Sequence, residues 1–284
     1  MTQQLRAAWR AGRRQARAEL RVYFLTPAFV ATLAAPLVLV ACVWFFLRDK
    51  ALADSVVQLS AFGLAGCLGA IGLLGAFQLL SEQWAERNDG TLLRLRTLPD
   101  GVGGWVTGKT LSVGLFTVFT FATVLVSSLL VVPSLAPAST VRLLALLATG
   151  VLSFFVFLPL GVIMGSYVRS TWGMLLTMLG CYLLLGLTGS VVPVTWLPSA
   201  AQWLAALTPC YWTSHLARWA LLPEAAGQVE LAGRFQPLVA LGVLALWAIV
   251  GYVLAPRVLR RRIGRETAHS LAKIRSNIST RGYA

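Results

Sequence analysis

Six long apolar runs restrict what this chain can fold into. Each run is roughly 18 residues or longer, and about 20 helical residues cross about 30 Å of hydrocarbon. None of the runs contains Asp or Glu, and they cover residues 27–47, 56–80, 106–132, 141–168, 172–194 and 235–258. Because the backbone inside lipid must satisfy its own hydrogen bonds, the runs predict helices and not strands. The expected fold class is therefore an all-α integral membrane protein with six transmembrane helices.

Composition and charge agree with this class. Hydrophobic residues make up 57% of the chain, charged residues 12%, and the mean hydropathy is +0.75. The net charge of +14 would suggest nucleic acid in a soluble protein, but cytoplasmic loops of membrane proteins also hold excess Lys and Arg. With six spans, only five of the 24 Lys and Arg residues fall on the side of the membrane opposite the termini: Arg48, Lys50, Arg142, Arg218 and Arg234. We therefore predict cytoplasmic termini, a multi-pass protein of the inner (plasma) membrane, contact with anionic lipids and no nucleic-acid partner.

The chain divides into three parts. Residues 1–26 carry arginines at three- and four-residue steps on one face and apolar residues on another, which predicts a basic amphipathic helix in the membrane interface. Residues 27–258 form the six-helix transmembrane domain, and residues 259–284 form a basic cytoplasmic tail. The arginines of the first helix are Arg6, Arg10, Arg13, Arg17 and Arg21, and the apolar residues include Leu5, Trp9, Ala16 and Leu20.

Reactive side chains are few. Cys42, Cys67 and Cys181 lie in spans, Cys210 stands alone, and no C-x-x-C spacing suggests a metal or redox pair. The two histidines, His215 and His269, fall in the outer segment and the tail, so a nucleophile with its base at membrane depth is not expected. We expect His215 to be an interfacial polar residue. The sequence predicts no metal site, no catalytic residue and no enzyme activity of the chain itself.

Glycine occupies every third position through much of the second span, at Gly63, Gly66, Gly69, Gly72 and Gly75. A helix advances about 100° per residue, so each three-residue step precesses by roughly 60° and the glycines sweep round the helix. They provide a slender helix that several neighbours can approach closely. Direct contact with a substrate is the alternative role.

The outer segment, residues 195–234, is too polar and too rich in proline to be a seventh span. It contains Trp196, Trp203, Trp212 and Trp219, and indoles prefer the headgroup level. We predict a pair of short helices that re-enter the membrane or lie on its outer leaflet.

A cytoplasmic loop, residues 81–105, is predicted to contain a short helix. Asn88, Asp89 and Gly90 are turn formers that should end the second span. Residues 91–98 then form a leucine-rich helix that Pro99 stops. An exposed helix with so many leucines needs a partner surface, either lipid or another protein.

The chain resembles the ABC-2 family of ATP-binding-cassette transporter membrane subunits, close to drug-export permeases of the daunorubicin-resistance type. The loop matches the family at a glutamate, a Gly-Thr-Leu step and a Thr-x-Pro, and the outer segment matches at a proline, a Leu-Pro, a Leu-x-Pro and an arginine. The matching residues are Glu86, Gly90, Thr91, Leu92, Thr97 and Pro99 in the loop, and Pro193, Leu197, Pro198, Leu207, Pro209 and Arg218 outside.

This resemblance implies an ABC-2 permease fold of the type V exporter kind. The chain would pair with a second permease subunit, as a homodimer or heterodimer, and with two separate ABC ATPase subunits that bind ATP and magnesium, while the chain itself binds no cofactor. The helix from Leu5 to Tyr23 would be a second ATPase contact. The coupling helix would contact the ATPase through Glu86, Asp89, Gly90, Thr91, Leu92, Leu93, Arg94 and Leu95.

The resemblance also implies a substrate path between the two permease subunits, along the second and fifth spans. Four candidate residues of the fifth span share a helical face by their three- and four-residue steps, although core packing explains the same stripe. The candidates are Gly66, Gly69, Leu73, Thr177, Cys181, Leu184 and Thr188. The expected function is ATP-driven export of a hydrophobic or amphipathic molecule such as a drug, lipid or natural product.

Two other functions stay open as alternatives. A proton-driven carrier generally places ionisable residues inside its spans, and the absence of acidic residues there indicates energy from outside the membrane. An ion-coupled secondary transporter that uses Na⁺ and backbone carbonyls is still an alternative, although Pro36 and Pro159 form no obvious repeat. A membrane assembly subunit without transport activity is the other, and the coupling-loop resemblance argues against it.

One motif suggests that the chain binds ATP directly. Residues 103–110, GGWVTGKT, satisfy the phosphate-loop pattern G-x-x-x-x-G-K-[ST]. A phosphate loop follows a buried strand and opens a soluble helix, whereas here LPDGV precedes the motif and a membrane span follows it. We therefore expect no nucleotide at this site, with Trp105 at the headgroup level and Lys109 at the cytoplasmic end of the third span.

Overall fold

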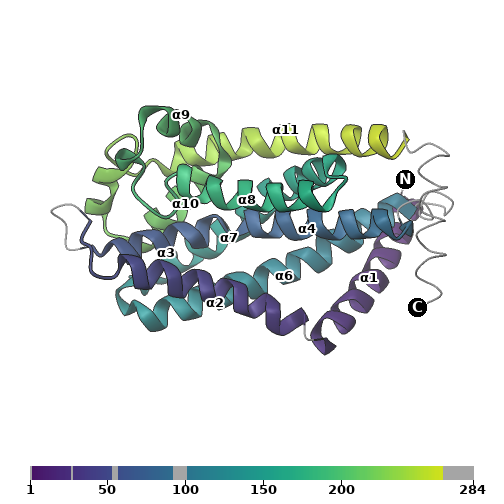
Figure 1. The fold of residues 1–284 in the computed structure, drawn as a ribbon, viewed down its shortest axis with the longest axis horizontal. Helices are drawn as coiled ribbons and strands as arrows, with labels where there is room; N and C mark the ends of the chain where they lie inside the picture. Colours follow the sequence, from purple (N-terminus) through teal and green to yellow (C-terminus); the bar gives the residue numbers. More distant parts are fainter. Residues whose placement is uncertain (1, 27, 53–56, 92–100, 265–284) are drawn as a thin grey trace.

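The computed structural model describes residues 2–26, 28–52, 57–91 and 101–264, which form a bundle of long helices (Figure 1). Within these ranges, the one strand-like contact is a bridge between Ala51 and Gln58. The predicted all-α fold is thus confirmed. The helices are α1 (Thr2–Leu25), α2 (Ala28–Leu47), α3 (Leu59–Gly69), α4 (Ile71–Asn88), α6 (Gly101–Val131), η2 (Pro133–Leu135), α7 (Thr140–Tyr167), α8 (Thr171–Leu187), η3 (Val194–Trp196), α9 (Ser199–Leu207), α10 (Pro209–Leu221), η4 (Glu224–Val229) and α11 (Pro237–Gly264).

The six predicted spans correspond to helices of different lengths. In the described residues α6, α7 and α11 are each long and apolar enough to cross a membrane. The pair α3 and α4 meets the same condition together, with a bend of 45° between them. The predicted first and fifth spans are the shorter apolar helices Leu33–Leu47, within α2, and α8. The helices fit a multi-pass membrane protein, and the number of six spans stays a prediction.

The glycines of the predicted second span allow close approach on several sides. A Cβ atom on Gly66 would lie 1.8 Å from the carbonyl oxygen of Ser190, in the turn after α8. On Gly69 it would lie 2.2 Å from a carbonyl oxygen of α10, and on Gly72 2.3 Å from one of α7. The glycines therefore face different neighbours, as predicted, and do not form a single seam. The helix breaks at Ala70, between α3 and α4.

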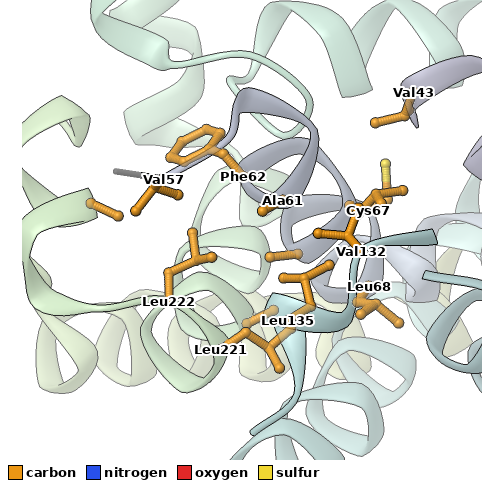
Figure 2. Close-up of a cluster of buried hydrophobic side chains, with 14 of the residues drawn as sticks. Val43, Val57, Ala61, Phe62, Cys67, Leu68, Val132, Leu135, Leu221 and Leu222 are labelled. Carbon is orange, nitrogen blue, oxygen red and sulfur yellow. The ribbon is translucent and has the colours of Figure 1, made fainter. Parts of the chain in front are cut away.

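The largest apolar core surrounds α3, which is buried along its whole length. Figure 2 shows side chains of this core converging from α2, α3, η2 and α10. Phe62 and Leu64 of α3 are completely buried, and Leu135 and Leu221 pack in the same cluster. This core fixes α10 against α3, so the predicted outer segment is part of the folded bundle.

The remaining helices define two ends of the molecule. Helix α7 packs against α4, α10 and α11, and α1 packs along α6. The C-terminal end of α4, the start of α6 and helix α1 lie at one end, while α9, α10 and η4 lie at the other (Figure 1). Helix α8 is peripheral, because only Cys181 and Leu185 are buried along it.

Candidate functional site

The loop predicted to contact an ATPase begins where α4 ends. Asp89 caps α4, and Gly90 has a positive φ of 75°, a conformation that glycine adopts without steric cost. This confirms the predicted turn and leaves Thr91 exposed. The coupling-helix candidates Leu92, Leu93, Arg94 and Leu95 lie outside the described residues. Their contact with a partner stays a prediction.

A partly buried ion cluster lies at the same end of the bundle, where α1, α4 and α6 meet. The Nζ atom of Lys109 lies 2.9 Å from a carboxylate oxygen of Glu19, 3.0 Å from one of Glu82 and 2.6 Å from one of Glu86. The indole Nε1 of Trp105 donates a hydrogen bond to the other oxygen of Glu86. We call these five residues the Lys109 cluster. Its lysine side chain is 6% exposed, and its carboxylates are 19–29% exposed.

The sequence positions these side chains through four-residue spacing. Residues four apart lie on the same face of a helix, which brings Glu82 and Glu86 together on α4, and Trp105 and Lys109 together on α6. Burial alone would raise the pKa of Glu19, but the hydrogen bond and charge of Lys109 outweigh it, so this pKa lies below its ordinary value. The cluster thus joins α1 to the end of α4 through charged groups.

Two of these residues behave differently from the expectation. Trp105 is only 2% exposed, so its indole is a core side chain and not a lipid-facing anchor. The carboxylate of Glu86, a candidate for contact with the ATPase, is directed at Lys109 within the same chain. The sequence signal for the cluster is a pair of four-residue spacings, Glu82 with Glu86 and Trp105 with Lys109. These spacings do not show which helices meet.

The GGWVTGKT motif lies inside a helix. Helix α6 begins at Gly101 and continues through the motif, so the later amides of the motif donate within the helix and are not directed at a ligand. Gly108 packs on α1, where a Cβ atom would lie 2.8 Å from Oε1 of Gln15. Its lysine, Lys109, is already bound by three carboxylates. This conformation does not fit a phosphate loop.

The substrate-path candidates fall into three groups. Gly66 and Gly69 are sealed against backbone atoms of the same chain. Leu73 and Cys181, from α4 and α8, pack in one buried cluster. The other three candidates lie on the same side of α8 as Cys181, since Thr188 is buried and Thr177 and Leu184 are half-buried. The path along these residues stays a prediction.

The predicted pair of short outer helices is present as α9 and α10. Helix α10 packs against α3, α7 and α11, and all but one of its residues are buried. Helix α9 is more exposed, and its Trp203 is 73% exposed. The two helices therefore differ in burial, because α10 packs inside the bundle while α9 lies at its surface.

A second, fully buried ion cluster comprises Tyr211, His215 and Arg218 of α10 and Glu230, the residue after η4, and we call it the Glu230 cluster. The guanidinium of Arg218 binds both carboxylate oxygens of Glu230, with Nε 2.6 Å and one Nη 3.2 Å away. The hydroxyl of Tyr211 donates to the same carboxylate at 2.7 Å, and Nδ1 of His215 lies 3.0 Å from it. All four residues are at most 1% exposed.

The electrostatics of the Glu230 cluster keep its acid ionised. Burial would raise the pKa of Glu230, but Arg218 and the hydrogen bond from His215 lower it to about 2. The prediction of His215 as an interfacial residue is wrong, since it is 1% exposed. Tyr211, His215 and Arg218 follow one another at four- and three-residue steps on α10, and this spacing was the sequence signal for a shared face. Among the described residues, no group of three or more His, Cys, Asp or Glu side chains is placed to hold a metal ion.

Comparison with known proteins identifies the family. No curated protein gives a significant match. A model of the ABC-2 type transporter family matches residues 3–222, a stretch that begins in α1 and ends directly after α10. This stretch is well over half of the 284-residue chain. The chain is therefore a membrane-spanning permease component and belongs to the ABC-2 type transporter family.

Proposed function

We propose that the chain is one permease subunit of an ATP-driven exporter that moves a hydrophobic or amphipathic molecule out of the cytoplasm. Two ABC ATPase subunits supply the energy by hydrolysing ATP with magnesium, and the chain itself does no chemistry. A second permease subunit completes the path. ABC-2 permeases pair with ABC ATPases, which supports this kind of partner.

The observation that carries the proposal is the Lys109 cluster. An ATPase that acts on the loop after α4 needs a firm link from that loop into the membrane helices. Lys109 of α6 binds Glu82 and Glu86 in the last turns of α4, and it also binds Glu19 of the amphipathic α1. Both proposed ATPase contacts are therefore joined to α6 by the same ammonium group.

Two further features support an apolar or amphipathic cargo. A cavity of about 510 Å³ lies between α1, α4 and α6. Its apolar walls include Leu20, Tyr23 and Phe116, and its charged side is formed by Glu19, Glu82 and Lys109. Helix α8 exposes apolar side chains on the side away from Cys181, among them Leu176 and Leu183. A second permease subunit would pack on this apolar side, while the path candidates Thr177, Cys181 and Leu184 lie on the opposite face of α8, which also carries no charged residue.

The decisive experiment uses the full chain co-expressed with its ABC ATPase partner and reconstituted in lipid nanodiscs. Leu92→Asp places a charge in the proposed coupling helix, and Leu92→Met is the matched control. We expect the Asp variant to lose co-purification of the ATPase and stimulation of ATP hydrolysis, while the Met variant keeps both. Normal assembly and coupling in Leu92→Asp would contradict the coupling assignment.

Direction and energy source need a separate measurement. In inverted membrane vesicles, an exporter accumulates its substrate inside when ATP is added, and a Walker-lysine variant of the ATPase partner abolishes this accumulation. Accumulation driven by an ion gradient without the ATPase would instead support a secondary transporter. Absence of any transport with intact ATPase assembly would support an assembly subunit.

A further inference from the structure

The Glu230 cluster connects several segments at the end of the bundle opposite α1, and one of its members can take up a proton. His215 and Arg218 come from α10, and Glu230 follows η4. Arg218 also donates to the carbonyl oxygen of Gly189, just after α8, at 3.1 Å. The His215 ring reaches Gln236, the residue before α11. The cluster thus ties together the end of α8, the middle of α10 and the start of α11.

The hydrogen bonds of His215 define where its proton lies. The backbone N–H of Gln236 approaches Nε2 of His215 at 2.8 Å. A backbone N–H can only donate, so Nε2 must present its lone pair. The proton of the neutral ring is therefore on Nδ1, which lies 3.0 Å from Oε2 of Glu230 and donates to it. This geometry requires a neutral imidazole.

The charges of the cluster balance only while this ring is neutral. Arg218 carries one positive charge and Glu230 one negative charge, and their hydrogen bonds join them directly. A proton on Nε2 of His215 would add a second positive charge in a site that is at most 1% exposed. It would also turn Nε2 into a donor facing the donor of Gln236, and a buried donor without an acceptor costs free energy.

The surrounding elements offer no carboxylate that would compensate this charge. Helices α3, α7, α9 and α11, which pack against or beside α10, contain no Asp or Glu. Their ionisable groups in the neighbourhood are Cys67 on α3 and Arg142 on α7, and those of α11 begin at Tyr252. Cys210 is on α10 itself, and Glu224 of η4 is exposed. Tyr211 already donates its proton to Glu230.

The hydrogen bond from Gln236 to His215 lies at the start of α11. Gln236 directly precedes α11, and its carbonyl oxygen accepts the amide of Ala240 in the first turn at 3.0 Å. We infer that His215 is a pH-sensitive contact whose neutral ring fixes the start of α11 to α10 and whose protonation releases it. Because the released form binds one more proton, acid favours release, by up to about tenfold in the opening equilibrium per pH unit.

The first test measures the tautomer directly. His215 and His269 are the only histidines of the chain, so His269→Gln leaves a single ring to observe. The full chain carrying this change is labelled with ¹⁵N-histidine and studied in lipid bilayers at pH 8. The inference expects the neutral Nδ1–H form. Observation of the Nε2–H form, or of imidazolium at this pH, would overturn it.

The second test measures release. Hydrogen–deuterium exchange of the peptide containing Gln236 is followed from pH 8 to pH 5 in nanodiscs, with intrinsic exchange rates corrected for pH. We expect the parent chain to lose protection in acid. His215→Gln keeps an acceptor near the Nε2 position and cannot titrate, so it should stay protected across the range.

A third variant and a control complete this design. His215→Phe offers no acceptor and should lack protection at every pH, while His269→Gln should behave as the parent chain. A parent chain with no acid response, or an unchanged response in His215→Gln, would refute the inference. Neither test needs a substrate or an ATPase, so their outcomes are independent of the proposed transport function.

Discussion

The two ion clusters lie at opposite ends of the bundle and compensate their charges in different ways. In the Lys109 cluster one ammonium contacts three carboxylates from two helices, and those carboxylates are 19–29% exposed. In the Glu230 cluster one guanidinium faces one carboxylate, and both side chains are completely buried. The first cluster keeps access to solvent, whereas the second is sealed in the protein.

This difference sets what each cluster can do. An ammonium is a compact charge on a flexible stem, so Lys109 can exchange partners among three carboxylates when helices shift. A guanidinium binds a carboxylate through two parallel hydrogen bonds, which fixes the orientation of both groups. The Lys109 cluster can therefore hold α1, α4 and α6 together while they shift, whereas the two hydrogen bonds from Arg218 fix the Glu230 carboxylate in one orientation.

The largest expected effect comes from Arg218→Met. This change leaves the Glu230 carboxylate buried without its guanidinium, which should cost about 3–5 kcal/mol in the free energy of unfolding. Chemical unfolding of the full chain in detergent micelles measures this loss. The double variant Arg218→Met with Glu230→Gln should recover most of it, and Arg234→Met, at an exposed position, is the control. A cost below about 1 kcal/mol would contradict a sealed ion pair.

The next effect is a pH dependence at Glu230. Its pKa is lowered from 4.5 to about 2, so its stabilising contribution is complete above the ordinary pKa and is lost as pH falls towards 2. This contribution is about 3 kcal/mol for a shift of this size. In the His215→Gln background, where this ring cannot take up a proton, the stability difference between chains with Glu230 and with Glu230→Gln should be constant above pH 5 and shrink in acid. Glu224→Gln, at an exposed carboxyl, should show no comparable difference.

A smaller effect is expected from Lys109→Met. The three carboxylates left behind can reach water, so the cost should be about 1–3 kcal/mol, less than for Arg218→Met. The stimulation of ATP hydrolysis in the partner should fall by a larger fraction than the free energy of unfolding, because α1, α4 and α6 lose their shared contact. Exposed Lys50 provides the matched control Lys50→Met. Equal losses for Lys109→Met and Arg218→Met would remove the contrast between the two clusters.

The smallest effect is expected from Trp105→Phe. The phenyl ring fills most of the buried space but cannot donate to Glu86, so the loss should be about 1 kcal/mol. The ammonium of Lys109 still neutralises that carboxylate, which limits the cost. Trp203→Phe changes an indole that is 73% exposed and should alter stability by less than about 0.5 kcal/mol. If Trp105→Phe and Trp203→Phe changed the free energy of unfolding equally, the hydrogen bond from the Trp105 indole to Glu86 would not contribute to stability.

Much of the fold follows from local sequence patterns. Apolar runs located the helices, the turn at Asp89 and Gly90 ended α4, and the glycine spacing indicated a helix approached from several sides. Prolines and tryptophans in the outer segment indicated short helices there. These predictions succeed because each depends on residues close together in the chain.

The candidate site was less accessible from sequence. The coupling loop was found through the family resemblance, but the inward direction of Glu86 and the burial of Trp105 were not. His215 was assigned to the interface because a lone histidine in an aromatic segment gives no sign of its partners. Four-residue spacings indicate which face a side chain occupies, but not what the face meets.

That this chain is a helical membrane protein follows from its amino-acid sequence, since hydropathy over a span depends only on local composition. Which charges meet depends on packing, because Glu19, Glu82 and Lys109 come from three helices. Packing of these helices places the Lys109 ammonium within 3.0 Å of both carboxylates. Packing also brings backbone atoms of α10 and α7 against Gly69 and Gly72, on either side of the 45° bend at Ala70. These ion pairs and close backbone approaches join distant segments, and such contacts exist only once the helices have assembled.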